Sequence, residues 1–175
     1  MTWHPKLVAL DIDGTLVGPD DVLTDSMRHA VQRVRDAGVP VVLATGRSWN
    51  ATRWVFEALK LPPTPVVLAN GAVVASYPPY QVITQATLDP GPIIETVLAR
   101  APHVAIAVAN PEGGYRFNKP FPDGELAGPL SLNTLEQLPS ARRCSSSCAT
   151  RRPAATTSSR WPTSWGCATS TTGWG

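Results

Sequence analysis

The sequence has no long apolar run and no recognisable leader. None of its hydrophobic runs approaches the roughly 18 residues of a membrane-spanning helix, so we expect no membrane association. Its first residues lack the charged-then-apolar layout and the cleavage site of a signal peptide, which predicts a cytoplasmic location. It also has no glycine-rich phosphate loop, so nucleotide binding through such a loop is not supported. With 175 residues, 43% of them hydrophobic, the chain can bury a core, which argues against disorder throughout.

The segment from Ser140 to Gly175 differs sharply from the rest of the chain. It contains no acidic residue, no lysine and no branched aliphatic residue, whereas Ser and Thr supply fifteen of its 36 positions. The preceding residues carry ten Lys and Arg against thirteen Asp and Glu, so their net charge is −3. The formal charge of +2 for the whole chain therefore comes from this tail, and it predicts no nucleic-acid-binding surface elsewhere.

The composition of the tail, residues 139–175, is open to several interpretations. Disorder is the default expectation, because the segment has little to bury. A zinc site at Cys144, Cys148 and Cys167 would lack a fourth ligand, since no histidine follows His103. Five arginines and three tryptophans are compatible with nucleic-acid binding, yet basic tails rich in Ser and Thr are usually only solvated.

A frameshift near Pro139 is a further hypothesis for this change. One permitted codon choice for residues 162–175, read in a shifted frame, gives ADELGLRDVHYWLG, which has the acids and leucines of an ordinary domain. Synonymous codons allow other choices, so the gene sequence is the test. A stop codon soon after Leu138 in the shifted frame would contradict the hypothesis.

Apolar runs and helical periodicity predict a β-α-β-α-β order in the first part of the chain. Helices are expected to begin near Thr24 and Ser48, which can cap them, and to end near Gly38 and before Pro62. The expected strands are short apolar runs of the kind buried in parallel sheets, at residues 6–10, 39–44 and 65–69. This order predicts an α/β fold with a Rossmann-like parallel sheet.

In such a sheet, the residues that follow the three strands meet at one edge. Asp11, Thr45 and Asn70 stand at these strand ends, and open α/β sheets bind their ligands there. After residue 72 the pattern changes to two candidate hairpins, at residues 73–84 and 104–117, around a short helix at 92–100. This predicts a small attached α+β unit.

Two carboxylates lie where the first strand opens into a loop. Asp11 is placed to act as a nucleophile and as an oxygen ligand for Mg²⁺, and Asp13 to act as a general acid and base. Two like charges this close favour a cation between them, which is a physical reason to expect a metal. The alternative is an Asp-Gly turn whose acids only cap the loop. The preceding strand and the Gly-Thr-Leu that follows favour the functional interpretation.

These motifs carry a resemblance to a known family. The hexapeptide from Asp11 to Leu16 resembles motif one of the haloacid dehalogenase-like (HAD) superfamily of aspartyl-phosphate phosphohydrolases. Residues 44–47, Ala-Thr-Gly-Arg, resemble motif two as it occurs in the Cof-type phosphatase branch, and residues 70–72 match the loop that follows there. The stretch at 73–136 is similar to the start of the cap domain of that branch.

The resemblance implies a partial HAD-like core at residues 1–72, a partial α+β cap at 73–138 and a low-complexity tail at 139–175. It implies Mg²⁺-dependent hydrolysis of a small phosphomonoester through an aspartyl-phosphate, and a small phosphorylated metabolite as the partner. Asp11 would be the nucleophile. Asp13 would be the general acid and base, and both aspartates would hold the metal, Asp13 through its backbone carbonyl.

The resemblance also assigns the residues around the phosphate. The Thr45 hydroxyl and the Gly46 amide would bind the transferring phosphoryl group, and Asn70 and Gly71 would line the entrance. Arg47 would contact phosphate or orient its neighbours. Taken alone, the Thr-Gly-Arg segment is also compatible with a simple helix cap after a strand. Its register with the first motif favours the functional interpretation.

Two elements of the family pattern are missing. The motif-three lysine is absent, since the last lysine is Lys119 in the expected cap, and the acidic motif four is absent, since no acid follows Glu136. Without them Mg²⁺ would be weakly held and the charge on the phosphoryl group poorly compensated. The alternative function is therefore a non-catalytic, truncated HAD-like protein with at most weak phosphate binding. Trp49 and Trp54, beside motif two, are expected to pack rather than to stack on substrate.

Overall fold

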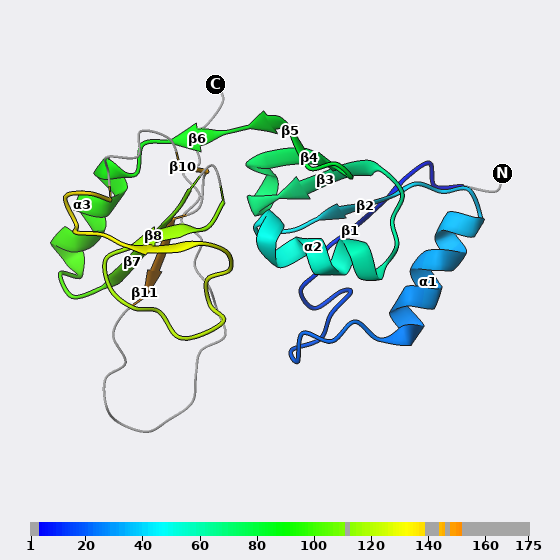
Figure 1. The fold of residues 1–175 in the computed structure, drawn as a ribbon, viewed down its shortest axis with the longest axis horizontal. Helices are drawn as coiled ribbons and strands as arrows, with labels where there is room; N and C mark the ends of the chain where they lie inside the picture. The colour runs from blue at the N-terminus through cyan, green and yellow to red at the C-terminus, as the bar shows by residue number, and fades with distance from the viewer. Residues whose placement is uncertain (1–3, 111–112, 139–143, 146–147, 152–175) are drawn as a thin grey trace. The chain divides into compact units, whose positions relative to one another are not determined.

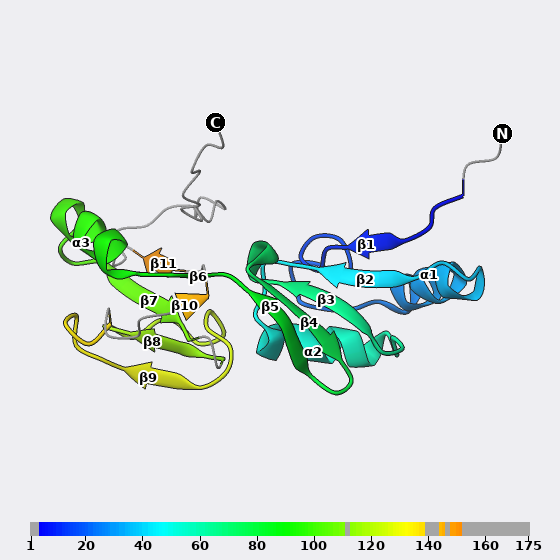
Figure 2. The ribbon, with the colours of Figure 1, turned by 90° about the horizontal axis from the view of Figure 1, so that it is seen from above.

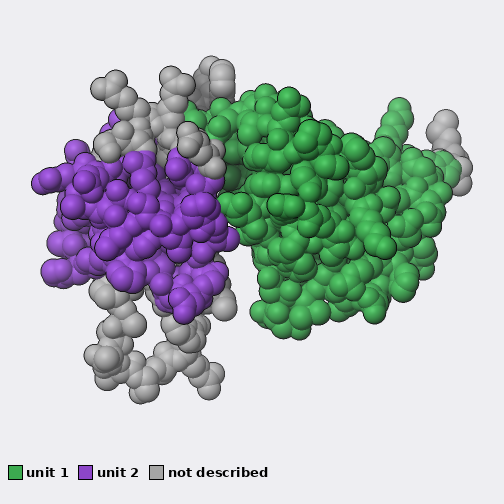
Figure 3. All heavy atoms as spheres, in the orientation of Figure 1, with its two compact units in different colours: residues 1–87 green, residues 88–175 purple. Residues whose placement is uncertain are grey.

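The computed structural model describes residues 4–110, 113–138, 144–145 and 148–151. The chain divides into two compact units, residues 1–87 and 88–175, which Figure 3 shows in different colours. Each unit has its own hydrophobic core. None of the helices in the described part of the chain combines the length and the apolar character that crossing a membrane requires.

The first unit is built on one five-stranded sheet, in the order β1-β2-β3-β4-β5 (Figures 1 and 2). The strands are β1 (Val8–Leu10), β2 (Val41–Ala44), β3 (Thr64–Leu68), β4 (Val73–Tyr77) and β5 (Gln81–Gln85). The first three run parallel, and β4 and β5 run antiparallel to their neighbours. The predicted β-α-β-α-β order and its parallel sheet are therefore confirmed.

Helix α1 (Asp25–Asp36) connects β1 to β2, and its two ends follow from local chemistry. The hydroxyl of Thr24 accepts a hydrogen bond from the amide of Met27 at 3.3 Å, which satisfies one free amide of the first turn. At the other end, Gly38 adopts a φ of +77°, and its amide donates to the carbonyl of Arg35 at 2.8 Å. Both predicted boundaries of this helix are confirmed.

Helix α2 (Trp49–Ala58) connects β2 to β3. Ser48 occupies the predicted cap position, but its hydroxyl makes no capping bond. The hydroxyl of Thr52 instead donates to the Ser48 carbonyl at 2.9 Å. The ring of Trp49 lies 4.7 Å from that of Tyr77 and 4.8 Å from that of Tyr80, so it packs as expected.

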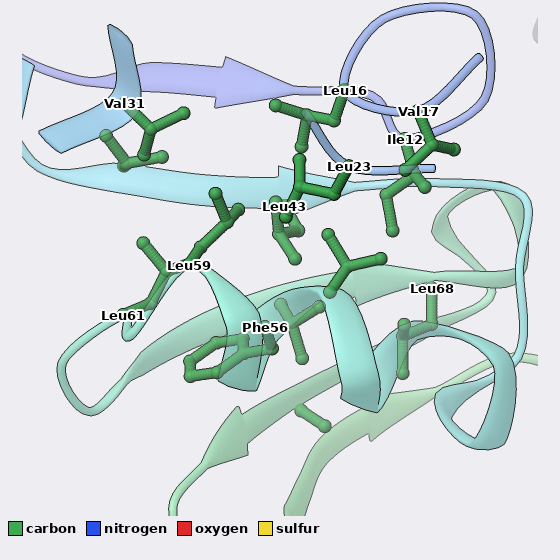
Figure 4. Packing of buried hydrophobic residues seen from close by; sticks show 14 of the residues in the cluster. Ile12, Leu16, Val17, Leu23, Val31, Leu43, Phe56, Leu59, Leu61 and Leu68 are labelled. Carbon is green, nitrogen blue, oxygen red and sulfur yellow. The ribbon is translucent and has the colours of Figure 1, made fainter. Parts of the chain in front are cut away.

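The core of the first unit extends into the loop between β1 and α1 (Figure 4). Four residues of this loop are nearly inaccessible to solvent and join strand residues such as Leu43 and the helix residue Phe56: Ile12, Leu16, Val17 and Leu23. Burying each of these side chains contributes roughly 1.5–3 kcal/mol. The loop that carries the two aspartates is thus anchored to the core by the residues between and after them.

The hairpin of β4 and β5 belongs to the first sheet. We expected the core to end at residue 72 and the hairpin to open the second unit. Instead β4 pairs with β3 along its whole length, from Val73 beside Leu68 to Tyr77 beside Thr64, so the first unit continues to residue 87. The predicted hairpin is present, but the sequence does not show which strand it will pair with.

The second unit contains helix α3 (Gly91–Arg100) and a four-stranded sheet in the order β11-β7-β8-β9. Ile94, Ile106, Val108 and Leu138 are among its core residues. The strands of this sheet are β7 (Ala105–Ala109), β8 (Tyr115–Phe117), β9 (Leu130–Leu132) and β11 (Cys148–Arg151). A separate two-stranded sheet is formed by β6 (Thr87–Leu88) and β10 (Cys144–Ser145). The predicted helix and the second hairpin are present. Strands β10 and β11 fall within the tail for which we expected disorder, and most of the tail lies outside the described residues.

Candidate active site

The loop after β1 turns tightly around the carbonyl of Ile12. That oxygen accepts the amides of Leu16 at 2.9 Å and Val17 at 3.0 Å, and the amide of Gly14 donates back to the Val17 carbonyl at 2.9 Å. Gly14 has a φ of +72°, a conformation that glycine adopts without steric cost. Since Ile12 points into the core, the residues on either side of it, Asp11 and Asp13, are left at the surface.

Asp11 lies at the carboxyl edge of the sheet and is exposed. Its Oδ1 accepts the amide of Ile12 at 2.7 Å. Because Leu10 is in register with Leu43 of β2, Asp11 is level with Ala44 and adjacent to the loop that begins at Thr45. The side chain of Asp11 is thus directed away from packing, and it is accessible to a ligand from solvent.

The loops after β2 and β3 are tied together through Thr45. Its carbonyl accepts the amide of Asn70 at 3.1 Å, and the carbonyl of Arg47 accepts the amide of Ala69 at 3.0 Å. The Thr45 side chain is buried, and its hydroxyl oxygen accepts the amide of Arg47 at 3.1 Å. That bond uses a lone pair of the oxygen, so the hydroxyl keeps its own proton to donate to a ligand.

The segment after β3 holds an unusual backbone conformation. Ala69, Asn70 and Gly71 all have left-handed φ angles, of 49°, 54° and 91°. Such strain in non-glycine residues is concentrated at functional sites. It turns the side chain of Asn70 over Gly46, where an added Cβ would lie 3.0 Å from the Asn70 Oδ1. A side chain at position 46 would therefore require the Asn70 amide to shift by a few tenths of an ångström.

Asp13 and Arg47 form a two-pronged ion pair across the two loops. The Nε of Arg47 donates to Asp13 Oδ2 at 3.0 Å, and its Nη2 donates to Oδ1 at 2.7 Å. These hydrogen bonds lower the pKa of the Asp13 carboxyl, an effect that partial burial opposes and the positive charge of Arg47 reinforces. The pKa of Arg47 is raised, first by the hydrogen bond to Asp13. Arg47 is the more buried partner, with 18% of its side chain exposed against 60% for Asp13.

Arg47 makes two more contacts with its side chain. Its Nη1 donates to the Ala51 carbonyl at 3.3 Å, and its Nη2 also donates to the carboxylate of Asp21. Of the two roles expected for Arg47, these contacts correspond to orienting its neighbours. Sequence reasoning did not identify Asp21, because no spacing rule relates a loop aspartate to an arginine 26 positions later.

The oxygen donors near Asp11 suit a hard cation. The bonds that close the loop use the carbonyls of Ile12 and Val17, so the carbonyl of Asp13 is outside them. The described residues contain no group of three or more His, Cys, Asp or Glu side chains that could hold a metal ion. One carboxylate and one carbonyl fit Mg²⁺ that keeps most of its water ligands, so the site fits the ion as a weak one. Lys119 lies in the second unit, where its Nζ donates to the His103 carbonyl at 2.9 Å.

Comparison with known proteins identifies relatives of this chain. The sequence profile of the haloacid dehalogenase-like hydrolases matches residues 8–137. A 5-amino-6-(5-phospho-D-ribitylamino)uracil phosphatase of Bacillus subtilis is 38% identical over 74 residues, which cover 42% of this chain and 27% of the relative. A pyridoxal phosphate phosphatase of Escherichia coli is 35% identical over 92 residues, which cover 53% of this chain and 32% of the relative.

The fold has close counterparts among solved structures. A phosphatase of the HAD enzyme superfamily from Bacteroides thetaiotaomicron superimposes with a TM-score of 0.63 at 22% identity, covering 83% of this chain and 55% of the other. At that identity the likeness establishes the fold. The chain spans 27% and 32% of the lengths of the two curated relatives and about half of the solved structure.

Proposed function

The chain belongs to the haloacid dehalogenase-like hydrolases, and from this we propose that its first unit hydrolyses small phosphomonoesters through an aspartyl-phosphate. The observation that carries the proposal is the exposed carboxylate of Asp11 at the strand edge, beside the loop of Thr45 and the ion-paired Asp13. The named relatives, whose substrates are small phosphorylated molecules, support it.

In the proposed first step, an oxygen of Asp11 attacks phosphorus and the P–O bond to the leaving group breaks. Asp13, in its protonated form, gives its proton to the departing alcohol oxygen. In the second step Asp13 removes a proton from water, the water oxygen attacks phosphorus, and the bond to Asp11 breaks. Inorganic phosphate leaves, and both aspartates return to their starting forms.

The neighbouring loops supply the donors for the transferring group. We propose that the Thr45 hydroxyl and the Gly46 amide donate to phosphoryl oxygens, while Asn70 and Gly71 form the rim of the site. Fixed donors of this kind stabilise charge that develops during the reaction without reorganising. Gly46 has no side chain of its own to cover this amide, and the side chain of Asn70 packs closely beside it.

The ion pair sets a condition on the acid step. Arg47 lowers the pKa of Asp13, so the free protein holds this group as a carboxylate at neutral pH. A bound phosphoryl dianion beside Asp13 counters this, because a like charge disfavours the ionised carboxyl. We infer that Asp13 takes up its proton when substrate binds.

Mg²⁺ would be held by the Asp11 carboxylate and the Asp13 carbonyl. When bound, it supplies positive charge that offsets the phosphoryl oxygens and the nucleophile. A second candidate function is phosphate binding without turnover. It is supported by the finding that the described residues hold no group of three or more His, Cys, Asp or Glu that could bind a metal ion.

A phosphatase assay separates the two functions. The purified chain is incubated with p-nitrophenyl phosphate, with and without Mg²⁺, beside Asp11→Asn and the control Asp20→Asn. The carboxylate of Asp20 accepts the amide of Val22 at 3.4 Å. Turnover that needs Mg²⁺ and disappears in Asp11→Asn, but not in the control, supports the enzyme. No turnover from protein shown to be folded supports the second candidate. Turnover that survives Asp11→Asn rules out the proposed nucleophile.

A further inference from the structure

The carboxylate of Asp21 shares the guanidinium of Arg47 with Asp13. Arg47 Nη2 donates to an oxygen of each, and Asp21 reaches it from the loop between β1 and α1. The Arg47 side chain is mostly buried, so its position is set by these partners rather than by solvent.

The backbone at Asp21 is held in an uncommon conformation. Its φ is +54°, and its amide donates to the Gly18 carbonyl at 3.0 Å, closing a four-residue turn. The turn lies between Val17 and Leu23, which are bridged to each other and buried in the core. Among residues with side chains, Asn and Asp are enriched in this conformation, and Asp adds a charge. The turn therefore presents a carboxylate at a fixed position.

Three groups together fix the plane of the guanidinium. Nη1 of Arg47 donates to the Ala51 carbonyl, and Nη2 donates to Asp21. On the opposite edge of the guanidinium, Nε and the same Nη2 donate to the two carboxylate oxygens of Asp13. A planar fork held on its far side can impose one orientation on the carboxylate that it binds.

We propose that Asp21 is a positioning residue: through Arg47 it orients the carboxylate of Asp13 toward the reacting group. The inference rests on the proposed function, since the proton transfers of Asp13 are what the orientation serves. Outer partners that orient a reactive group typically change activity by roughly tenfold or more when removed. The loop between β1 and α1 is thereby coupled to the acid–base chemistry.

The decisive variant is Asp21→Asn, because asparagine keeps the size of the side chain and tolerates the same backbone conformation while removing the charge. Asp20→Asn is the matched control. Asp20 lies one position away, and its carboxylate accepts a hydrogen bond from the amide of Val22 instead of from Arg47. The first readout is the ¹³Cγ chemical shift of Asp13 at pH 7, assigned by its loss in Asp13→Asn. We expect Asp21→Asn to move this signal and Asp20→Asn to leave it in place.

An unchanged Asp13 signal in Asp21→Asn overturns the proposal, because a purely local contact between Asp21 and Arg47 leaves the orientation of Asp13 as it was. The second readout is the steady-state kinetics with p-nitrophenyl phosphate. Asp21→Asn is expected to lower kcat by roughly tenfold with KM little changed, and an unaffected kcat also counts against positioning. If the unaltered chain shows no turnover, the proposed function fails by itself, and the chemical shift decides the role of Asp21.

Discussion

The ion pair between Asp13 and Arg47 supports a quantitative prediction. A double-mutant cycle with Asp13→Asn, Arg47→Gln and the combined variant measures their coupling in the free energy of unfolding. Two short hydrogen bonds at 2.7 and 3.0 Å, to an arginine with 18% exposure, place the pair above the roughly 0–1 kcal/mol of surface ion pairs. The 60% exposure of Asp13 places it below the roughly 3–5 kcal/mol lost when a buried pair is broken. We expect a coupling of about 1–2 kcal/mol at pH 7.

The pH dependence of this coupling has a definite sign. The pKa of Asp13 is lowered in the folded protein, so its contribution is complete above the pKa of the unfolded chain, near 4. The contribution is lost as the pH falls through the lower pKa of the folded state. Urea unfolding followed by circular dichroism, at pH 7 and near pH 2.5, measures both values. A coupling under about 0.5 kcal/mol at pH 7, or an equal coupling at both pH values, would refute this reasoning.

Two further substitutions test the site and the core. Gly46→Ala places a methyl group 3.0 Å from the Asn70 Oδ1. We expect it to lower the free energy of unfolding by about 1–3 kcal/mol, measured by urea unfolding, and to abolish turnover or inorganic phosphate binding, the latter measured by calorimetry. A variant with normal stability and binding would show that Asn70 moves aside freely. Leu43→Ala empties a fully buried position and should cost about 2–5 kcal/mol, whereas Leu7→Ala, at a residue that is 52% exposed, should change stability by at most about 0.5 kcal/mol; similar losses in both variants would contradict the assignment of the core.

The sequence predicts the parallel half of the first sheet well, because the residues of each strand and helix carry a local pattern typical of that element. The apolar runs that became β1, β2 and β3 are bounded by turn residues, and the helices between them begin and end near the expected residues. The edge position of Asp11 and of Thr45 follows from that order alone. Their mutual register, in contrast, comes from the sheet itself.

The sequence does not show which strands pair, or which side chains meet, when they are far apart along the chain. The hairpin of β4 and β5 has strand periodicity, but its membership in the first sheet depends on pairing with β3, which no local signal encodes. The same holds for Asp21, whose contact with Arg47 depends on how the loop between β1 and α1 folds back. The contacts of Arg47 also could not be predicted from the sequence, because an arginine can bind a phosphate or a carboxylate equally well.

Strand β5, one of the two edge strands of the first sheet, affects how the protein should be handled. Its residues Val82 and Ile83 are 43% and 60% exposed, and the strand bears no charged side chain and no proline. Natural proteins usually blunt such edges with lysine, proline or a covering segment, because an uncovered edge templates aggregation. Among the described residues β5 has a neighbouring strand on one side only, so we expect association by strand addition at this edge to increase with protein concentration.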